Sequence, residues 1–110
     1  MIIDVGTQEL KKMGYEVLTA RHGKEAIEVY QQNCQKVAMV ILDMIMPEIG
    51  GGETYDRLKE IDPQVKVLLS SGYSLDGQAT EILKRGCDGF IQKPFSMKDL
   101  SRKIRQIITK

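Results

Sequence analysis

A run of six apolar residues ends abruptly at an acidic residue near the middle of the chain. The run is VAMVIL, residues 37–42, and Asp43 follows it directly. A short, continuous apolar run is typical of a strand that is covered on both faces, as strands of parallel sheets are. The sequence therefore favours a parallel α/β sheet, with Asp43 at the carboxyl end of a buried strand.

Extended and helical patterns alternate along the rest of the chain. Further strands are expected at 15–19, 65–69 and 89–92, and helices around 26–30, 55–61, 79–83 and 100–108. Ser96 and Asp99 resemble a capping box at the head of the last helix, with Asp where Glu or Gln is usual. This alternation predicts an α/β fold with three layers, a doubly wound parallel sheet between helices.

The N-terminal segment is ambiguous between helix and strand. Ile3, Leu10 and Met13 recur at helical spacing, and Gly14 would close the segment, which predicts a helix over 2–13. The sheet then has no strand from this segment, so its first strand is expected to be missing or replaced. In the alternative, residues 1–5 form a strand that carries Asp4.

Length and charge exclude several classes of protein. The chain has 110 residues, enough for one domain, and its formal net charge is +1. Without a broad basic face, direct binding of nucleic acid is not expected. No apolar stretch approaches a membrane span and no signal peptide is recognisable, which predicts a cytoplasmic protein without a membrane segment. Cys34 and Cys87 lack the spacing of metal ligands and are expected to be reduced thiols.

Three residues that directly follow or close the expected strands form a candidate chemical site. Asp43, Ser71 and Lys93 should meet at the carboxyl edge of the sheet, where open α/β sheets bind ligands. A carboxylate can attack phosphorus, an ammonium can neutralise the transferring oxygens, and a hydroxyl can donate a hydrogen bond to one of them. Phosphoryl oxygens also favour a divalent cation. The combination predicts a phosphoryl-transfer site.

The chain resembles the receiver domain of two-component response regulators, of the chemotaxis-protein type. The resemblance rests on LDMIMP at 42–47, SSGY at 70–73 and GFIQKPF at 89–95, which occur in the family's order. It implies the flavodoxin-like receiver fold, a five-stranded sheet in the order 2-1-3-4-5. It also implies phosphoryl transfer from a phosphohistidine on a histidine kinase or a phosphotransfer protein, and signalling to a downstream protein partner.

The resemblance also implies roles for individual residues. Asp43 corresponds to the phosphoacceptor, Ser71 to the hydroxyl that moves toward the phosphoryl group, and Lys93 to the invariant lysine. Ile45 corresponds to the residue whose backbone carbonyl binds Mg²⁺ together with Asp43. Phe90 corresponds to the aromatic switch residue that acts with Ser71.

The expected N-terminal helix departs from the family pattern. Receivers begin with a central strand that ends in two adjacent acids, and these acids hold the metal. Residues 1–110 are therefore expected to be a receiver domain shortened at its N-terminus, with weakened or lost Mg²⁺ binding. Two strand edges would be exposed, which would allow copies of the chain to associate. The missing front favours the C-terminal receiver of a hybrid sensor histidine kinase.

Three functions remain open at this point. The first is a phosphoacceptor that takes part in its own phosphotransfer and is not otherwise an enzyme. The second is a receiver-like interaction module that no longer binds Mg²⁺ or accepts phosphate. The third is a phosphatase with an aspartate nucleophile, and it is the weakest because Ile45 stands where such enzymes place a second acid.

Overall fold

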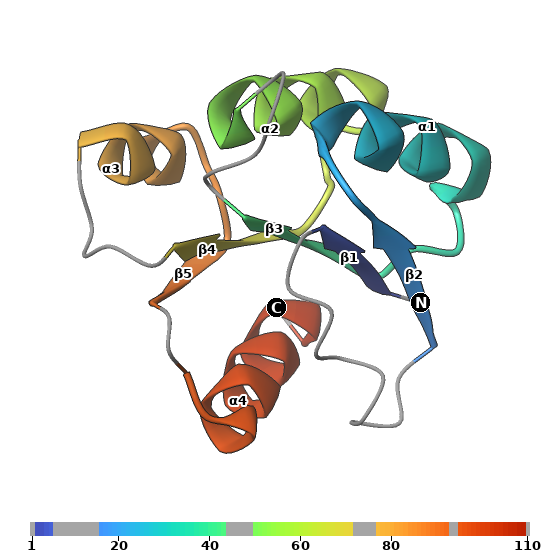
Figure 1. Cartoon of the computed structure of the whole chain (residues 1–110). Helices are drawn as coiled ribbons and strands as arrows, with labels where there is room; N and C mark the ends of the chain where they lie inside the picture. Colours follow the sequence, from blue (N-terminus) through green and yellow to red (C-terminus); the bar gives the residue numbers. More distant parts are fainter. Residues whose placement is uncertain (1, 6–15, 44–49, 72–76, 93–94, 110) are drawn as a thin grey trace.

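Five parallel strands form one sheet in the order β2-β1-β3-β4-β5 (Figure 1). The computed structural model describes residues 2–5, 16–43, 50–71, 77–92 and 95–109. The strands are β1 (Ile2–Val5), β2 (Val17–Ala20), β3 (Met39–Asp43), β4 (Val67–Ser71) and β5 (Gly89–Gln92). The strand order is the one that the resemblance implied.

Helices cover both faces of the sheet, so the predicted three layers are confirmed. One face carries α1 (Gly23–Asn33), α2 (Gly51–Ile61) and α3 (Gly77–Lys84), and the other carries α4 (Met97–Ile108), as Figure 1 shows. None of these described helices is both long and apolar enough to span a membrane.

Alternation along the strands divides the buried core into two clusters. In β3, Val40 and Leu42 pack toward α1 and α2, whereas Met39 and Ile41 pack toward α4. The second cluster is completed by the apolar stripe of α4, which consists of Leu100, Ile104 and Ile107. Strands buried on both faces read as continuous apolar runs, which explains the sequence of residues 37–42.

The predicted helix over 2–13 is wrong for residues 2–5. They form β1, the central strand, which pairs with β2 on one side and β3 on the other. All four residues of β1 are buried, and Ile2 and Ile3 face opposite layers of the core. Tertiary pairing here outweighs a helical spacing that was carried by few residues. The rest of the predicted helix lies outside the described residues.

The first strand of the sheet is therefore present, and the prediction that it is missing is corrected. The two strand edges that its absence would have exposed, those of β2 and β3, are both hydrogen-bonded to β1. The proposed reason for association between copies of the chain is removed with it, because no central edge is left open in the described sheet.

Local signals in the sequence fix the ends of the helices. Ser96 is the N-cap of α4, and its Oγ accepts a hydrogen bond from the backbone amide of Asp99 at 3.1 Å. His22 caps α1 in the same way, with Nδ1 accepting from the amide of Glu25 at 3.3 Å. This position gives His22 a structural role. After α3, the chain turns at Gly86, whose φ of 110° favours glycine.

Candidate functional site

Three polar residues lie at the carboxyl ends of β3 and β4. Asp43 is the last residue of β3, and its register partner on β4 is Ser70. Ser71 follows as the last residue of β4. Asp43 is partly buried, whereas Ser70 and Ser71 are buried. The last residues of β3 and β4 thus place Asp43 and Ser71, two of the predicted site residues, at the same edge of the sheet, and their meeting stays a prediction.

Asp43 and Ser70 belong to the same face of the sheet. Their neighbours two residues earlier, Ile41 and Leu68, are register partners and both pack in the α4 cluster. Side chains alternate along a strand with a period of two, so Asp43 and Ser70 continue this face. By the same alternation, Ser71 belongs to the face of Leu69.

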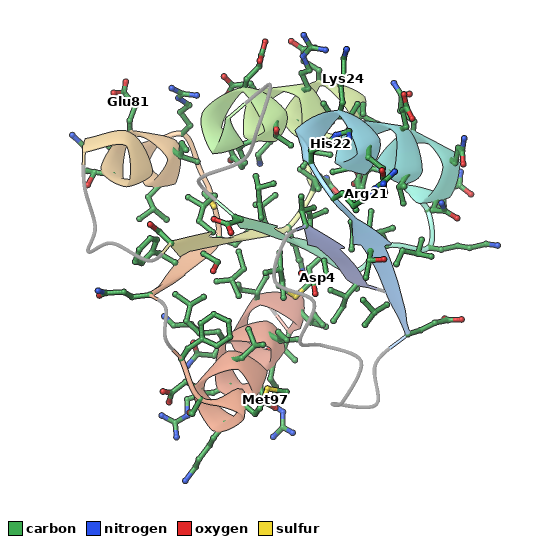
Figure 2. All side chains as sticks on the ribbon, in the orientation of Figure 1. Asp4, Arg21, His22, Lys24, Glu81 and Met97 are labelled. Atoms are coloured by element: carbon green, nitrogen blue, oxygen red, sulfur yellow. The ribbon has the colours of Figure 1, made fainter. Side chains whose placement is uncertain are left out.

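Asp4 adds a second carboxylate on this face. It lies in β1 two residues after Ile2, on the side of the sheet that α4 covers, and is 1% exposed (Figure 2). Its register partner on β3 is Ile41, which is two residues before Asp43. Strand spacing and rise then place the Cα atoms of Asp4 and Asp43 about 8 Å apart.

The two aspartates are the described residues that could contribute to a cation site. Carboxylate oxygens are ligands that Mg²⁺ prefers, and Mg²⁺ keeps several of its waters when few protein ligands are offered. Within the described ranges, no group of three or more His, Cys, Asp or Glu residues is clustered for a metal. Asp4 is followed by Val5, so β1 supplies one acid where the family pattern has two.

Two of the predicted site residues lie outside the described residues. These are Lys93, the predicted invariant lysine, and Ile45, the predicted source of a backbone carbonyl for the metal. Phe90, the predicted switch residue, lies in β5 as the register partner of Leu69. It is partly buried and packs against the core that faces α1, α2 and α3.

Sequence reasoning missed Ser70. Ser70 follows three apolar residues of β4 and, like them, is fully buried, with 0% exposure. Its Oγ has no hydrogen-bond partner in the part of the chain that the structure describes. The signal in the sequence was a polar residue next to the expected hydroxyl, but only the register shows that it faces Asp43.

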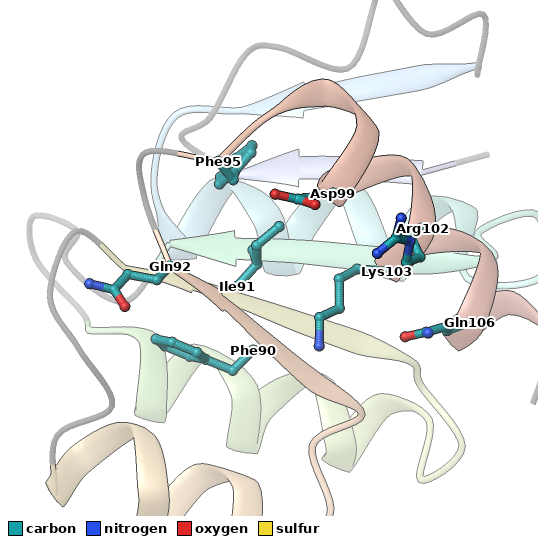
Figure 3. A pocket seen from close by; sticks show the side chains of 8 residues that line it. All are labelled: Phe90, Ile91, Gln92, Phe95, Asp99, Arg102, Lys103 and Gln106. Carbon is teal, nitrogen blue, oxygen red and sulfur yellow. The ribbon is translucent and has the colours of Figure 1, made fainter.

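A hollow of about 440 Å³ lies between β5 and α4. In Figure 3, Phe95 and Asp99 stand at the start of α4, and Lys103 reaches from α4 toward β5. Phe90 points to the other side of β5. The remaining residues that line the hollow are Ile91, Gln92, Arg102 and Gln106. The hollow therefore combines aromatic, amide and cationic groups beside an edge strand.

Cys87 lies at the opposite end of β5 from the site. Its Sγ donates to the carbonyl of Val67 at 3.2 Å, and burial raises the pKa of the thiol to about 11. A thiol with this pKa stays protonated and unreactive near neutral pH. The hydrogen bond to Val67 gives Cys87 a structural role at the first residue of β4.

The family model described as response regulator receiver domain matches residues 1–105. The chemotaxis protein CheY of Thermotoga maritima is 36% identical over 87 residues, which cover 78% of this chain and 71% of that protein. The sensor kinase CckA of Brucella abortus is 32% identical over 105 residues, 96% of this chain but 11% of the kinase. The chain thus spans about a tenth of that kinase's length.

Solved structures show the same fold. A response regulator receiver domain protein from Clostridium thermocellum superposes with a TM-score of 0.90 and 28% identity, covering 98% of this chain and 93% of that one. The receiver domain of NtrX from Brucella abortus has a TM-score of 0.87 with 23% identity, covering 100% of this chain and 99% of that one. The second likeness is one of fold alone.

Proposed function

The chain belongs to the family of response regulator receiver domains, which work in two-component signalling, and we propose that it accepts a phosphoryl group on Asp43. One observation carries the proposal. Asp43 ends a central strand, with the Asp4 carboxylate on the same face of the sheet and two hydroxyl side chains on the next strand.

The proposed reaction is a direct transfer to a carboxylate. An oxygen of Asp43 attacks the phosphorus of a phosphohistidine on a histidine kinase or a phosphotransfer protein. The new oxygen–phosphorus bond forms as the nitrogen–phosphorus bond breaks, and the electron pair returns to the histidine nitrogen. The product is an acyl phosphate on Asp43. The chain supplies the acceptor for one transfer, and we propose no further enzymatic activity.

Mg²⁺ is the proposed cofactor of this transfer. Asp4 and Asp43 would hold it, and Ile45 would add its backbone carbonyl if this chain follows the family pattern. When bound, the cation neutralises charge on the phosphoryl oxygens. Lys93 would share that task at the end of β5, and the hydroxyl of Ser71 would donate a hydrogen bond to a phosphoryl oxygen.

The proposed output is a change in affinity for a downstream protein. Phe90 is the register partner of Leu69, and Leu69 lies two residues before Ser71 on β4. Residues two apart on a strand share a face, so Ser71 and Phe90 lie on the same face of the sheet. A shift of Ser71 toward the phosphoryl group would free space for the ring of Phe90. The surface of β4 and β5 on the side of α3 would then present different contacts to a partner. We propose that signalling takes place in the cytoplasm.

Incubation with Mg²⁺ and acetyl phosphate tests the proposed function. Mass spectrometry of the intact protein should show the gain of one phosphoryl group, and chelation of Mg²⁺ should abolish the gain. Asp43→Asn should gain none, whereas Glu28→Gln on the exposed side of α1 should behave as the parent does. Equal labelling of the parent and Asp43→Asn would falsify Asp43 as the acceptor.

A second candidate function is a receiver-like module that binds partners without accepting phosphate. The single acid of β1 favours it, because one carboxylate fewer weakens a Mg²⁺ site. Calorimetric titration with Mg²⁺ separates the two. Heat of binding that is lost in Asp4→Asn supports the phosphoacceptor, and the lack of any heat together with no gain of phosphate supports the module.

A further inference from the structure

Ser70 carries a hydroxyl that is fully buried in β4. Its Oγ is inaccessible to solvent and has no hydrogen-bond partner among the residues that the structure describes. Buried polar atoms are nearly always paired, because an unpaired one loses the hydrogen bonds it would make with water. Because an unpaired buried hydroxyl lowers folding stability, we looked for a functional role of Ser70.

The position of Ser70 indicates such a role. Ser70 is the register partner of Asp43, and the two side chains share the face of the sheet that α4 covers. Side chains of register partners on adjacent strands start about 5 Å apart at Cβ. Rotation of the serine side chain between its staggered positions can therefore turn Oγ toward the Asp43 carboxyl group without movement of the backbone.

The neighbouring hydroxyl occupies a different place. Ser71 alternates to the other face of β4 and is the register partner of Gln92 on β5. The two hydroxyls thus approach the end of β3 from opposite faces of the sheet. Ser70 lies beside Asp43 and can approach its carboxyl group, whereas the phosphoryl group would lie beyond the end of β3.

We propose that Ser70 Oγ donates a hydrogen bond to the Asp43 carboxyl group when the acyl phosphate forms and breaks. This inference rests on the proposed function of Asp43. In hydrolysis, a water oxygen attacks phosphorus and the bond between phosphorus and Asp43 breaks. The electron pair moves onto the carboxylate, the water's proton goes to solvent, and inorganic phosphate leaves.

A donor at Asp43 assists this step because the carboxylate carries more negative charge than the acyl phosphate carbonyl. Hydrogen bonds to charged acceptors are about twice as strong as those to neutral ones. The bond from Ser70 therefore strengthens as the acyl phosphate breaks, and it lowers the barrier. Ser70 shortens the lifetime of the phosphorylated state.

Ser70→Ala tests the inference through two opposite effects. Loss of the hydroxyl should slow hydrolysis of the acyl phosphate about five-fold or more, since this is the effect of one donor to a developing charge. The same change should raise the melting temperature of the unphosphorylated protein by about 4 °C, because an unpaired buried group is removed. A longer phosphate lifetime together with higher stability is the expected result.

Ser70→Cys is the matched control for packing. The thiol fills the space of the hydroxyl but is a weak donor. Slow hydrolysis in both variants supports donation by Oγ. Slow hydrolysis in Ser70→Ala and the parent's rate in Ser70→Cys would assign the effect to packing and overturn the inference.

The outcomes separate this inference from the proposed function. If the parent gains no phosphate, Asp43 is not an acceptor and both fail. If the parent gains phosphate and Ser70→Ala hydrolyses at the parent's rate, the inference alone fails, and Ser70 is a tolerated polar residue in the core. To measure the lifetimes, the phosphodonor is removed, samples are quenched at successive times, and the phosphorylated fraction is determined by mass spectrometry of the intact protein.

Discussion

Arg85 joins α2 to the end of α3 through both carboxylate oxygens of Asp56. Its Nη1 donates to Asp56 Oδ1 at 2.8 Å and to Oδ2 at 2.9 Å. Both side chains are about half exposed, so water screens the pair and its contribution to folding stability is small. The pair fixes the position of α3 beside α2 more than it stabilises the whole domain.

Arg85→Ala should therefore loosen α3 and leave global stability almost unchanged. We expect the free energy of unfolding by urea to fall by no more than about 1 kcal/mol. Hydrogen exchange of amides in α3 should quicken, while exchange in α1 stays as in the parent. Arg57→Ala, which breaks a pair within α2, is the control and should leave exchange in α3 unaffected.

Removal of the α4 cap should weaken the packing of that helix. Ser96→Ala removes the acceptor for the Asp99 amide, and loss of such a cap costs about 1 kcal/mol of folding stability. Urea denaturation followed by circular dichroism measures the change. Ser101→Ala lies inside the helix and makes no cap, so it should be neutral or slightly stabilising. Equal losses in the two variants would contradict the role of Ser96.

Truncation of the central strand should be among the most damaging changes. Ile3 is 0% exposed in the core cluster beneath α1 and α2. Ile3→Ala should lower the free energy of unfolding by about 2–5 kcal/mol because it leaves a cavity. Ala substitution at Glu28, which is exposed on α1, should change it by less than about 0.5 kcal/mol. A loss for Ile3→Ala as small as that at Glu28 would argue against a buried β1.

Alkaline pH should destabilise the protein through Tyr55. Burial raises the pKa of Tyr55 to about 12, with smaller contributions from Cys87, Asp88 and Asp56. The folded state then holds the phenol proton more tightly than the unfolded chain, whose tyrosine pKa is about 10. The resulting stability is present below pH 10 and is lost as the pH rises from about 10 to 12.

Tyr55→Phe isolates this contribution. The Tyr55 hydroxyl has no hydrogen-bond partner in the described part of the chain, so its removal should cost little at pH 7. Melting temperatures measured from pH 8 to 11 should fall less steeply in Tyr55→Phe than in the parent. Parallel curves would mean that Tyr55 does not titrate abnormally.

The sequence was most informative where one signal decided the structure. The run at 37–42 indicated a buried strand, and Asp43 stands at the carboxyl end of that strand, β3. Residues 2–5 were harder, since a short apolar segment fits a helix face and a buried strand equally well. Residues 2–5 form a strand because they pair with both β2 and β3, and this pairing is visible only in the assembled sheet.

Ser70 shows a second limit of sequence reasoning. Two adjacent serines differ in role only because neighbouring residues of a strand face opposite sides, and the register decides which one shares a face with Asp43. A shift by one residue would exchange Ser70 and Ser71. No local pattern in SSGY distinguishes the two.

The central place of β1 also affects the order in which the chain can fold. Ile2 pairs with Met39, 37 positions later in the chain, and no two strands of the sheet are joined by a hairpin. During synthesis, β1 leaves the ribosome before the other four strands but obtains its second neighbour only after α1 and β3 have followed. Pairings between distant segments form slowly, and the apolar first strand remains available to other chains until then. Folding yield should therefore depend on how quickly β3 reaches β1.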